Sequence, residues 1–139
     1  LETGGGIVKA LPLLKSDPFL VINGDIWTDI DLSLLAANFD SLAHLVLVKN
    51  PQHHLQGDFS LHGKRVREKQ DNQLSWTYSG MAMLKPVFFS QCREQRFALA
   101  PLLHKHIAQD QVTGEVFNGL WFDIGTRERL DDLNTLLKT

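Results

Sequence analysis

The sequence predicts an α/β fold built around one core. Two short apolar runs rich in β-branched residues, 19–23 and 45–48, are typical of strands buried inside a sheet. A periodic apolar pattern over 32–42 predicts a helix between them, and this order is typical of a right-handed parallel crossover. With 139 residues and 43% hydrophobic content, the chain is long enough for one globular core and too short for two.

Composition and charge exclude several classes of protein. The formal net charge is −2 and the basic residues form no patch, so neither nucleic acid nor an anionic membrane is indicated as a partner. A single cysteine, Cys92, excludes an internal disulfide and suits a reducing compartment. No apolar run approaches the roughly 20 residues of a membrane span. We therefore expect a cytoplasmic protein.

The sequence pattern predicts a helix, a strand and a second helix in the N-terminal third of the chain. Thr3 is the expected N-cap of the first helix, which Pro12 should bend or end because proline removes a hydrogen bond. The strand at 19–23 follows. The helix over 32–42 would direct five residues inward: Leu34, Leu35, Ala36, Phe39 and Leu42.

The middle of the chain changes character. Three short segments broken by glycine and Asp-Asn turns predict hairpins rather than crossovers: 59–61, 65–67 and 74–76. A strand over 78–84 then ends at Pro86, and a helix is predicted over 99–108.

The C-terminal part predicts two strands and a helix. We expect strands over 112–116 and 120–124 to pair with one another. Thr126 should cap a helix over 127–137, with leucines at 130, 133, 136 and 137 facing inward.

Asp25 is the first candidate functional residue. It follows the apolar run 19–23 after Gly24, at the carboxyl end of a strand, where open α/β sheets build ligand sites. A carboxylate there can hold a divalent cation against a substrate phosphate. The alternative is that Asp25 caps a turn or the helix beginning near Leu32, and this segment alone leaves both open.

Asp123 is the second candidate. It interrupts the apolar segment 121–124, where a charge is costly unless it is paired or binds a metal. Because Asp25 and Asp123 both lie in or after apolar strands, the fold can bring them together as ligands of one Mg2+. The alternative is that Asp123 caps a helix or pairs with Arg127 or Arg129.

Three further motifs are weaker. Gly4-Gly5-Gly6 before a helix would let a ligand approach the backbone. Glu68-Lys69 offers an acceptor for sugar hydroxyls and a cation for phosphate, although such pairs are common on solvated surfaces. His53-His54 has no cysteine or third histidine at ligand spacing, so a polar or substrate-facing role is preferred over a zinc site.

Five segments in this order, which run over nearly the whole chain, resemble those of one enzyme family: 1–7, 19–25, 66–69, 77–80 and 121–130. The family is that of the sugar-1-phosphate nucleotidyltransferases. Within it, the loop 50–59 resembles that of bacterial N-acetylmuramate-α-1-phosphate uridylyltransferases, which act in peptidoglycan recycling in the cell wall. Mannose-1-phosphate guanylyltransferase is the alternative specificity.

The resemblance implies a three-layer αβα fold with a mixed, mostly parallel sheet, of which 1–139 is the C-terminal portion of one domain. It implies Mg2+-dependent transfer of a nucleotidyl group, from UTP, to N-acetylmuramic acid 1-phosphate, with release of pyrophosphate. Asp25 and Asp123 match the metal ligands, and Lys69 matches the lysine that meets the sugar phosphate. The residues that match the substrate pocket are Glu2, Thr3, Gly4, Asn23, Glu68 and Gly80.

One departure from the family pattern is the missing glycine-rich N-terminal loop, which cradles the triphosphate. We therefore expect that this chain alone does not catalyse efficiently, and that its uncovered apolar surface leads to an accompanying segment, self-association or marginal solubility. Two other interpretations stay open. One is a metal-dependent glycosyltransferase that uses Asp29-Ile30-Asp31, and the other is a non-catalytic module that binds sugar nucleotides.

Overall fold

A computed structural model describes residues 1–35 and 39–138. The strands are β1 (Phe19–Ile22), β2 (Ile26–Thr28), β3 (Ala43–Val48), β4 (Phe59–His62), β5 (Arg65–Glu68), β6 (Thr77–Leu84), β7 (Val112–Val116) and β8 (Trp121–Asp123). The α-helices are α1 (Glu2–Ala10), α2 (Leu99–Ala108) and α3 (Arg127–Leu137). Short 3-10 helices are η1 (Leu11–Leu13), η2 (Leu32–Leu34), η3 (Gln52–His54) and η4 (Pro86–Phe89).

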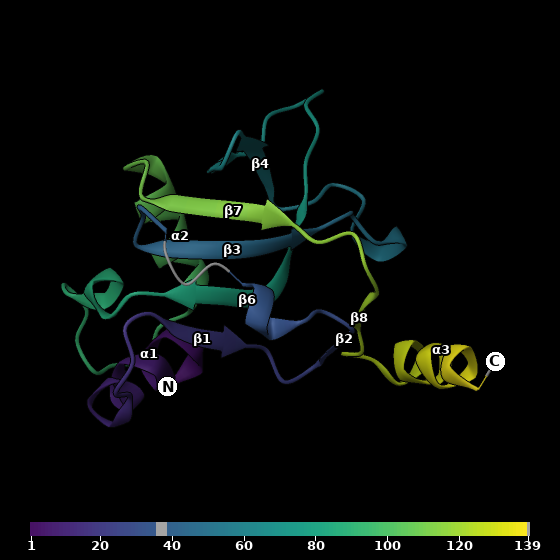
Figure 1. Cartoon of the computed structure of the whole chain (residues 1–139), viewed down its shortest axis with the longest axis horizontal. Coiled ribbons are helices and arrows are strands. Elements are labelled where there is room, and N and C mark those ends of the chain that lie inside the picture. Colours follow the sequence, from purple (N-terminus) through teal and green to yellow (C-terminus); the bar gives the residue numbers. More distant parts are fainter. Residues whose placement is uncertain (36–38, 139) are drawn as a thin grey trace.

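The strands form two sheets. Six of them lie in the order β1-β6-β3-β7-β5-β4, and β2 pairs with β8 in a separate two-stranded ladder (Figure 1). The large sheet is mixed, as expected: β3 and β7 are parallel, and the other neighbours are antiparallel. Four of its six strands nevertheless run in one direction, and only β5 and β6 run in the opposite direction.

The core lies on both faces of β3, whose six residues are all buried. On one face Leu45 and Leu47 pack in a large cluster with residues of α2 and η4. On the other face Val46 packs against Leu35 and Met81, and this smaller cluster is closed by apolar side chains of β2, β8 and their loops. Helices α1 and α2 contact one another, whereas α3 lies beside β8, beyond the end of the large sheet (Figure 1). None of the described helices is long and apolar enough to cross a membrane.

Several predicted elements are confirmed. The helix over 99–108 is α2, the strand over 78–84 is β6, and the hairpin of 59–61 with 65–67 is β4–β5. The last helix begins where expected, because the Thr126 hydroxyl accepts a hydrogen bond from the Arg129 amide at 3.2 Å. The first helix ends before Pro12, which lies in η1.

The predicted helix over 32–42 is wrong. The Asp31 carboxylate accepts hydrogen bonds from the amide and the hydroxyl of Ser33, which caps the start of the single 3-10 turn η2. Leu35 then has an extended backbone and enters the smaller cluster, while Leu34 is 77% exposed. Residues 36–38 lie outside the described residues, and 39–42 contain no helix.

Five smaller expectations are also wrong. The strands β7 and β8 do not pair with one another, because β7 lies between β3 and β5 while β8 pairs with β2. The strand β1 is an edge strand with only Phe19 buried, rather than a strand buried on both faces. Segment 74–76 contributes one bridge to Phe59 and no strand. Helix α1 begins before Thr3, and of the four α3 leucines only Leu133 is buried.

Candidate functional site

Two neighbouring cavities open beside the carboxyl end of β1. The first has a volume of about 350 Å3 and the second of about 500 Å3. Four residues line both of them, so one ligand can extend from one cavity into the other: Asn23, His54, Asp58 and Tyr78. We call them the carboxylate cavity, which Asp25 and Asp123 also line, and the α2 cavity, which Lys69, His104 and the first residues of α2 also line.

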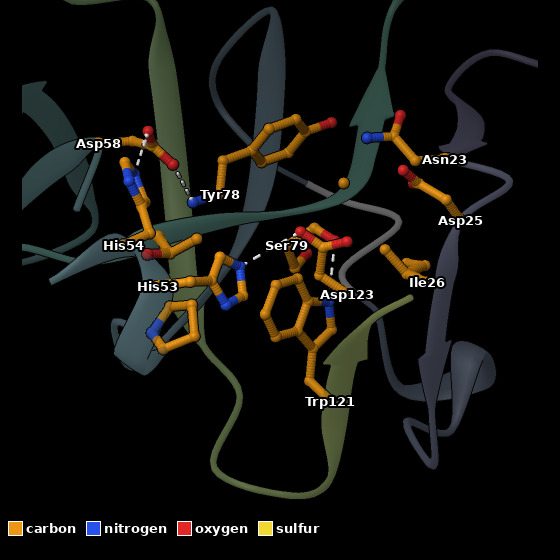
Figure 2. A pocket seen from close by; sticks show the side chains of 13 residues that line it. Asn23, Asp25, Ile26, His53, His54, Asp58, Tyr78, Ser79, Trp121 and Asp123 are labelled. Atoms are coloured by element: carbon orange, nitrogen blue, oxygen red, sulfur yellow. Dashed lines mark hydrogen bonds and ion pairs between the residues drawn. The ribbon is translucent and has the colours of Figure 1, made fainter. Parts of the chain in front are cut away.

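The β2–β8 ladder brings Asp25 and Asp123 together. Ile26 lies opposite Asp123 in the register, and the Ile124 amide donates to the Asp25 carbonyl oxygen at 2.8 Å. A Cβ atom built on Gly125 would lie 3.0 Å from Asp123 Oδ1 and 3.3 Å from Asp25 Oδ2. The two carboxylate oxygens are thus at most 6.3 Å apart. Figure 2 shows both side chains at the same cavity.

Asp123 also has basic neighbours. Its Oδ2 lies 3.3 Å from His53 Nε2 (Figure 2). Its Oδ1 lies 3.6 Å from an Arg129 nitrogen, so the alternative of an ion pair with Arg129 is part of the structure. The Gly125 amide donates to the same carboxylate at 2.8 Å. Within residues 1–35 and 39–138, no group of three or more His, Cys, Asp or Glu side chains is arranged to hold a metal.

The Asp29-Ile30-Asp31 motif does not contribute to either cavity lining. Asp29 accepts a hydrogen bond from the Leu120 amide at 2.8 Å, and Asp31 caps η2. The hydrogen bonds from Ser33 hold the pKa of the Asp31 carboxyl below its usual range. Both carboxylates thus have structural roles, which argues against the glycosyltransferase interpretation.

Asn23 and Gly80 meet where β1 ends. The Asn23 amide donates to the Gly80 carbonyl oxygen at 2.9 Å, and both residues line the carboxylate cavity. Gly80 has a φ of +86°, and a Cβ there would lie 2.8 Å from Asn23 Nδ2. Glycine is needed at this position because the backbone is left-handed and the Asn23 side chain occupies the adjacent space.

A hydrogen-bonded group of three residues lines both cavities. His54 Nε2 lies 2.9 Å from Asp58 Oδ1, and the Tyr78 amide donates to Asp58 Oδ2 at 2.8 Å (Figure 2). The Tyr78 hydroxyl oxygen is buried and has no hydrogen-bond partner among the described residues. Burial raises the pKa of the Tyr78 phenol above its ordinary value, so this hydroxyl keeps its proton.

The Glu68-Lys69 pair lies at the α2 cavity, but its two members differ. Lys69 lines the cavity and donates from Nζ to the Gly57 carbonyl oxygen at 2.9 Å. Glu68 Oε1 instead lies 2.6 Å from His104 Nδ1, and His104 rather than Glu68 lines the cavity.

The N-terminal candidates separate in space. Thr3 lines the α2 cavity. Glu2 is exposed, with Oε1 3.9 Å from an Arg96 nitrogen, and Gly4 is buried where a Cβ would overlap the Phe97 ring. Neither Glu2 nor Gly4 is among the residues that line the two cavities.

The sequence predicts no functional role for three residues that line the cavities: Asp58, Tyr78 and His104. For His53 and His54 it predicts one shared polar or substrate-facing role. In the structure they point to different carboxylates, Asp123 and Asp58. His104 and His106, two apart on α2, also separate, because His106 is buried against the Phe88 carbonyl oxygen.

The chain is similar to curated bacterial enzymes over nearly its whole length. It is 43% identical over 143 residues to N-acetylmuramate alpha-1-phosphate uridylyltransferase of Neisseria meningitidis serogroup B, which covers 98% of the chain and 62% of that protein. The enzyme of the same name from Caulobacter vibrioides is 32% identical over 90% of the chain and 57% of its own length. D-glycero-alpha-D-manno-heptose 1-phosphate guanylyltransferase of Campylobacter jejuni is 26% identical over 92% of the chain and 59% of its own length.

Solved structures share the fold. HddC from Yersinia pseudotuberculosis superimposes with a TM-score of 0.79 at 22% identity, over 99% of this chain and 63% of that one. The inositol-1-phosphate CTP transferase from T. maritima gives a TM-score of 0.75 at 16% identity, over 99% of this chain and 62% of that one. No protein-family model matches the chain.

These similarities cover nearly the whole of this chain but only part of each relative. The chain spans about three fifths of the length of the curated proteins that it matches. Within that part, the agreement covers the mixed sheet and the flanking helices. The chain is therefore a homologue of the sugar-phosphate nucleotidyltransferases and has their fold.

Proposed function

We propose that the protein containing this chain transfers a nucleotidyl group from UTP to N-acetylmuramic acid 1-phosphate in the cytoplasm, with Mg2+ as cofactor. The relative of 43% identity that bears this activity in its name supports the assignment. The observation that carries it is the convergence of Asp25 and Asp123 on one cavity, which continues into a second cavity containing Lys69.

The two carboxylates fit a magnesium ion by their chemistry. Hard divalent cations prefer oxygen ligands, and Mg2+ is usually held by one or two carboxylates while substrate phosphates supply further ligands. Asp25 and Asp123 would hold the ion. Bound there, it would neutralise negative charge on the triphosphate.

The chain's own residues then have to position two polyanions. A phosphate oxygen of the sugar 1-phosphate forms a bond to the α-phosphorus of UTP, and the bond from that phosphorus to the bridging oxygen breaks, which releases pyrophosphate. The attacking oxygen is already an anion, so no general base is required, and alignment and charge neutralisation account for the rate. Lys69 supplies a positive charge at the α2 cavity, and Asn23, Thr3 and Gly80 shape the space around the sugar.

Conservative substitutions test the carboxylates. In a pyrophosphate-release assay on the full-length protein, Asp25→Asn and Asp123→Asn should each lower kcat by about 100-fold or more, because a charge aimed at the reacting phosphates is lost. Asp31→Asn is the matched control, since an asparagine still caps η2 and the side chain is remote from both cavities. Its rate should stay within about threefold of the wild type.

Two further measurements complete this test. The variants should unfold at nearly the same urea concentration as the wild type, because Asp25 is exposed and Asp123 is only partly buried. The Mg2+ concentration for half-maximal rate should rise in the Asp25→Asn and Asp123→Asn enzymes only. Wild-type rates in both variants would refute the assignment of these residues.

Guanylyl transfer is the second candidate, because one relative is named as a sugar 1-phosphate guanylyltransferase. A panel that combines UTP and GTP with N-acetylmuramic acid, mannose and heptose 1-phosphates separates the two. Pyrophosphate from GTP but not from UTP would overturn the uridylyl assignment. Binding of UDP-sugar without turnover by the full-length protein would instead support the non-catalytic module.

A further inference from the structure

His53 is a loop residue that contacts one of the two candidate metal ligands. It lies in η3, in the loop between β3 and β4, whereas Asp123 ends β8. Its Nε2 lies 3.3 Å from Asp123 Oδ2, and both side chains line the carboxylate cavity (Figure 2). The contact therefore joins this loop to the two-stranded ladder that carries the carboxylates.

The two carboxylate oxygens of Asp123 have different neighbours. Oδ1 accepts a hydrogen bond from the Gly125 amide at 2.8 Å, and the Cβ position of Gly125 is 3.0 Å from this oxygen and 3.3 Å from Asp25 Oδ2. Oδ1 thus lies on the side of Asp25, while Oδ2 is the oxygen that contacts His53. A carboxylate oxygen has two lone pairs, so Oδ1 can accept from the amide and still bind a cation.

Contacts that do not involve Asp123 hold the loop in place. The His54 amide donates to the Pro51 carbonyl oxygen at 3.0 Å within the turn η3. The His54 side chain is held in turn by Asp58, with Nε2 2.9 Å from Oδ1. Because His53 precedes His54 in this turn, the loop determines where the His53 ring starts, and the ring extends from there to Asp123.

The Asp123 carboxylate needs such a partner because its surroundings are open. Its side chain is 28% exposed, and the nearest Arg129 nitrogen is 3.6 Å from Oδ1, which is too far for a hydrogen bond. Carboxylates that bind metals usually have outer partners that fix their orientation. We propose that His53 is a positioning residue, which by its contact with Oδ2 keeps Oδ1 of Asp123 on the side of Asp25, where the two carboxylates can share a divalent cation. This inference rests on the proposed function.

Binding of Mn2+ tests the inference without catalysis. Mn2+ prefers oxygen ligands as Mg2+ does, and its binding to the full-length protein can be followed by electron paramagnetic resonance, with the product UDP-N-acetylmuramic acid present. The Asp123→Asn variant defines the binding that does not depend on this site. His53→Ala should weaken the remaining binding about tenfold, the lower end of the range for outer partners, because the His53 side chain is 40% exposed.

Two further variants separate positioning from a general effect on the loop. Glutamine can place an N–H group near the position of His53 Nε2, so His53→Gln should bind Mn2+ within about threefold of the wild type. Gln52 is exposed, lies in the same turn and lines neither cavity, so Gln52→Ala should bind Mn2+ as the wild type does. All three should unfold at nearly the wild-type urea concentration, since residues 52 and 53 are exposed.

Steady-state rates should show the same separation. In His53→Ala the Mg2+ concentration for half-maximal pyrophosphate release should rise about tenfold, while the rate at saturating Mg2+ should return to within about threefold of the wild type. A rate that stays low at saturating Mg2+, with unchanged Mn2+ affinity, would mean that His53 acts on the substrate, and it would overturn the positioning role.

The remaining outcomes also decide the question. Equal Mn2+ affinity in the wild type and His53→Ala overturns the inference, and so does tighter binding, which would make His53 a competitor of the cation. Failure of His53→Gln to recover any affinity overturns it as well. A wild type that releases pyrophosphate but binds no more Mn2+ than Asp123→Asn keeps the proposed transfer reaction and removes this inference. A wild type that releases no pyrophosphate from any substrate pair removes both.

Discussion

Replacement of Gly80 by alanine measures how tightly the end of β1 is held against β6. With φ at +86°, an L-residue costs about 1–2 kcal/mol in backbone strain. The new methyl would also lie 2.8 Å from Asn23 Nδ2 and 3.0 Å from Asn23 Cβ and Cγ. Because Cβ is the root of that side chain, rotation cannot remove the overlap, and overpacking adds roughly 1–3 kcal/mol.

Gly63 is the matched control for this substitution. Its φ is +60°, and a Cβ there would meet nothing within 4 Å, so Gly63→Ala carries the backbone strain alone. Replacing glycine by alanine also lowers the conformational entropy of the unfolded chain, and this stabilising effect applies to both variants. In urea unfolding, Gly80→Ala should therefore be less stable than Gly63→Ala by about 1–3 kcal/mol. A difference below about 0.5 kcal/mol would refute the overlap argument, because it is then within the scatter of surface substitutions.

Two further substitutions test buried polar groups. Tyr78 is the only tyrosine, and burial raises its pKa in the folded state, so the folded chain keeps the phenol proton more tightly than the unfolded chain does. Stability should thus fall as the pH rises above about 10, by up to about 1.4 kcal/mol per pH unit, and Tyr78→Phe should remove this part of the loss. Equal alkaline losses in both proteins, or phenolate absorbance that titrates near the ordinary pKa, would contradict it. His106→Leu should cost about 1–3 kcal/mol in urea unfolding, because the buried Phe88 carbonyl oxygen loses its donor, while the exposed Lys105→Leu should cost under about 0.5 kcal/mol.

Elements with strong local signals could be predicted from the sequence. Helix α2 has an apolar pattern of helical period and ends before Gln109 and Asp110, the latter with a left-handed φ of 61°. The Thr126 hydroxyl is a local cap that needs no tertiary contact. In both cases residues within one or two turns determine the structure, so a single sequence contains the necessary information.

The failed predictions depended on long-range contacts. The apolar residues of 32–42 have helical spacing, but Leu35 has an extended backbone and is buried by Val46 and Met81 rather than by a helical neighbour, so the turn that Asp31 caps ends after Leu34. The run at 19–22 has the composition of a central strand, yet Ile22 is 45% exposed because β1 has a neighbour on one side only. Composition indicates that a strand forms, but it does not indicate which strands will lie beside it.

Only the part of the site that has a local signal in the sequence could be predicted. The convergence of Asp25 and Asp123 was expected because each follows or interrupts an apolar run, and the β2–β8 ladder brings them to one cavity. Their roles as metal ligands stay a prediction. Tyr78 and His104 have no sequence signature, because each is positioned by a partner distant in the sequence, Asp58 and Glu68 respectively.

Strand β6 determines the geometry of the site through three consecutive residues. The Tyr78 amide donates to Asp58, the Ser79 carbonyl oxygen accepts from the Trp121 indole at 2.9 Å, and the Gly80 carbonyl oxygen accepts from Asn23. These contacts connect both cavities, the β8 strand that carries Asp123, and the end of β1. A two-stranded ladder such as β2–β8 is marginal by itself, so its carboxylates depend on this attachment. A slip of β6 by one residue would move these three backbone groups away from their partners and turn the buried Met81, Ala82 and Leu84 side chains to the opposite face, so the site and the core would be lost together.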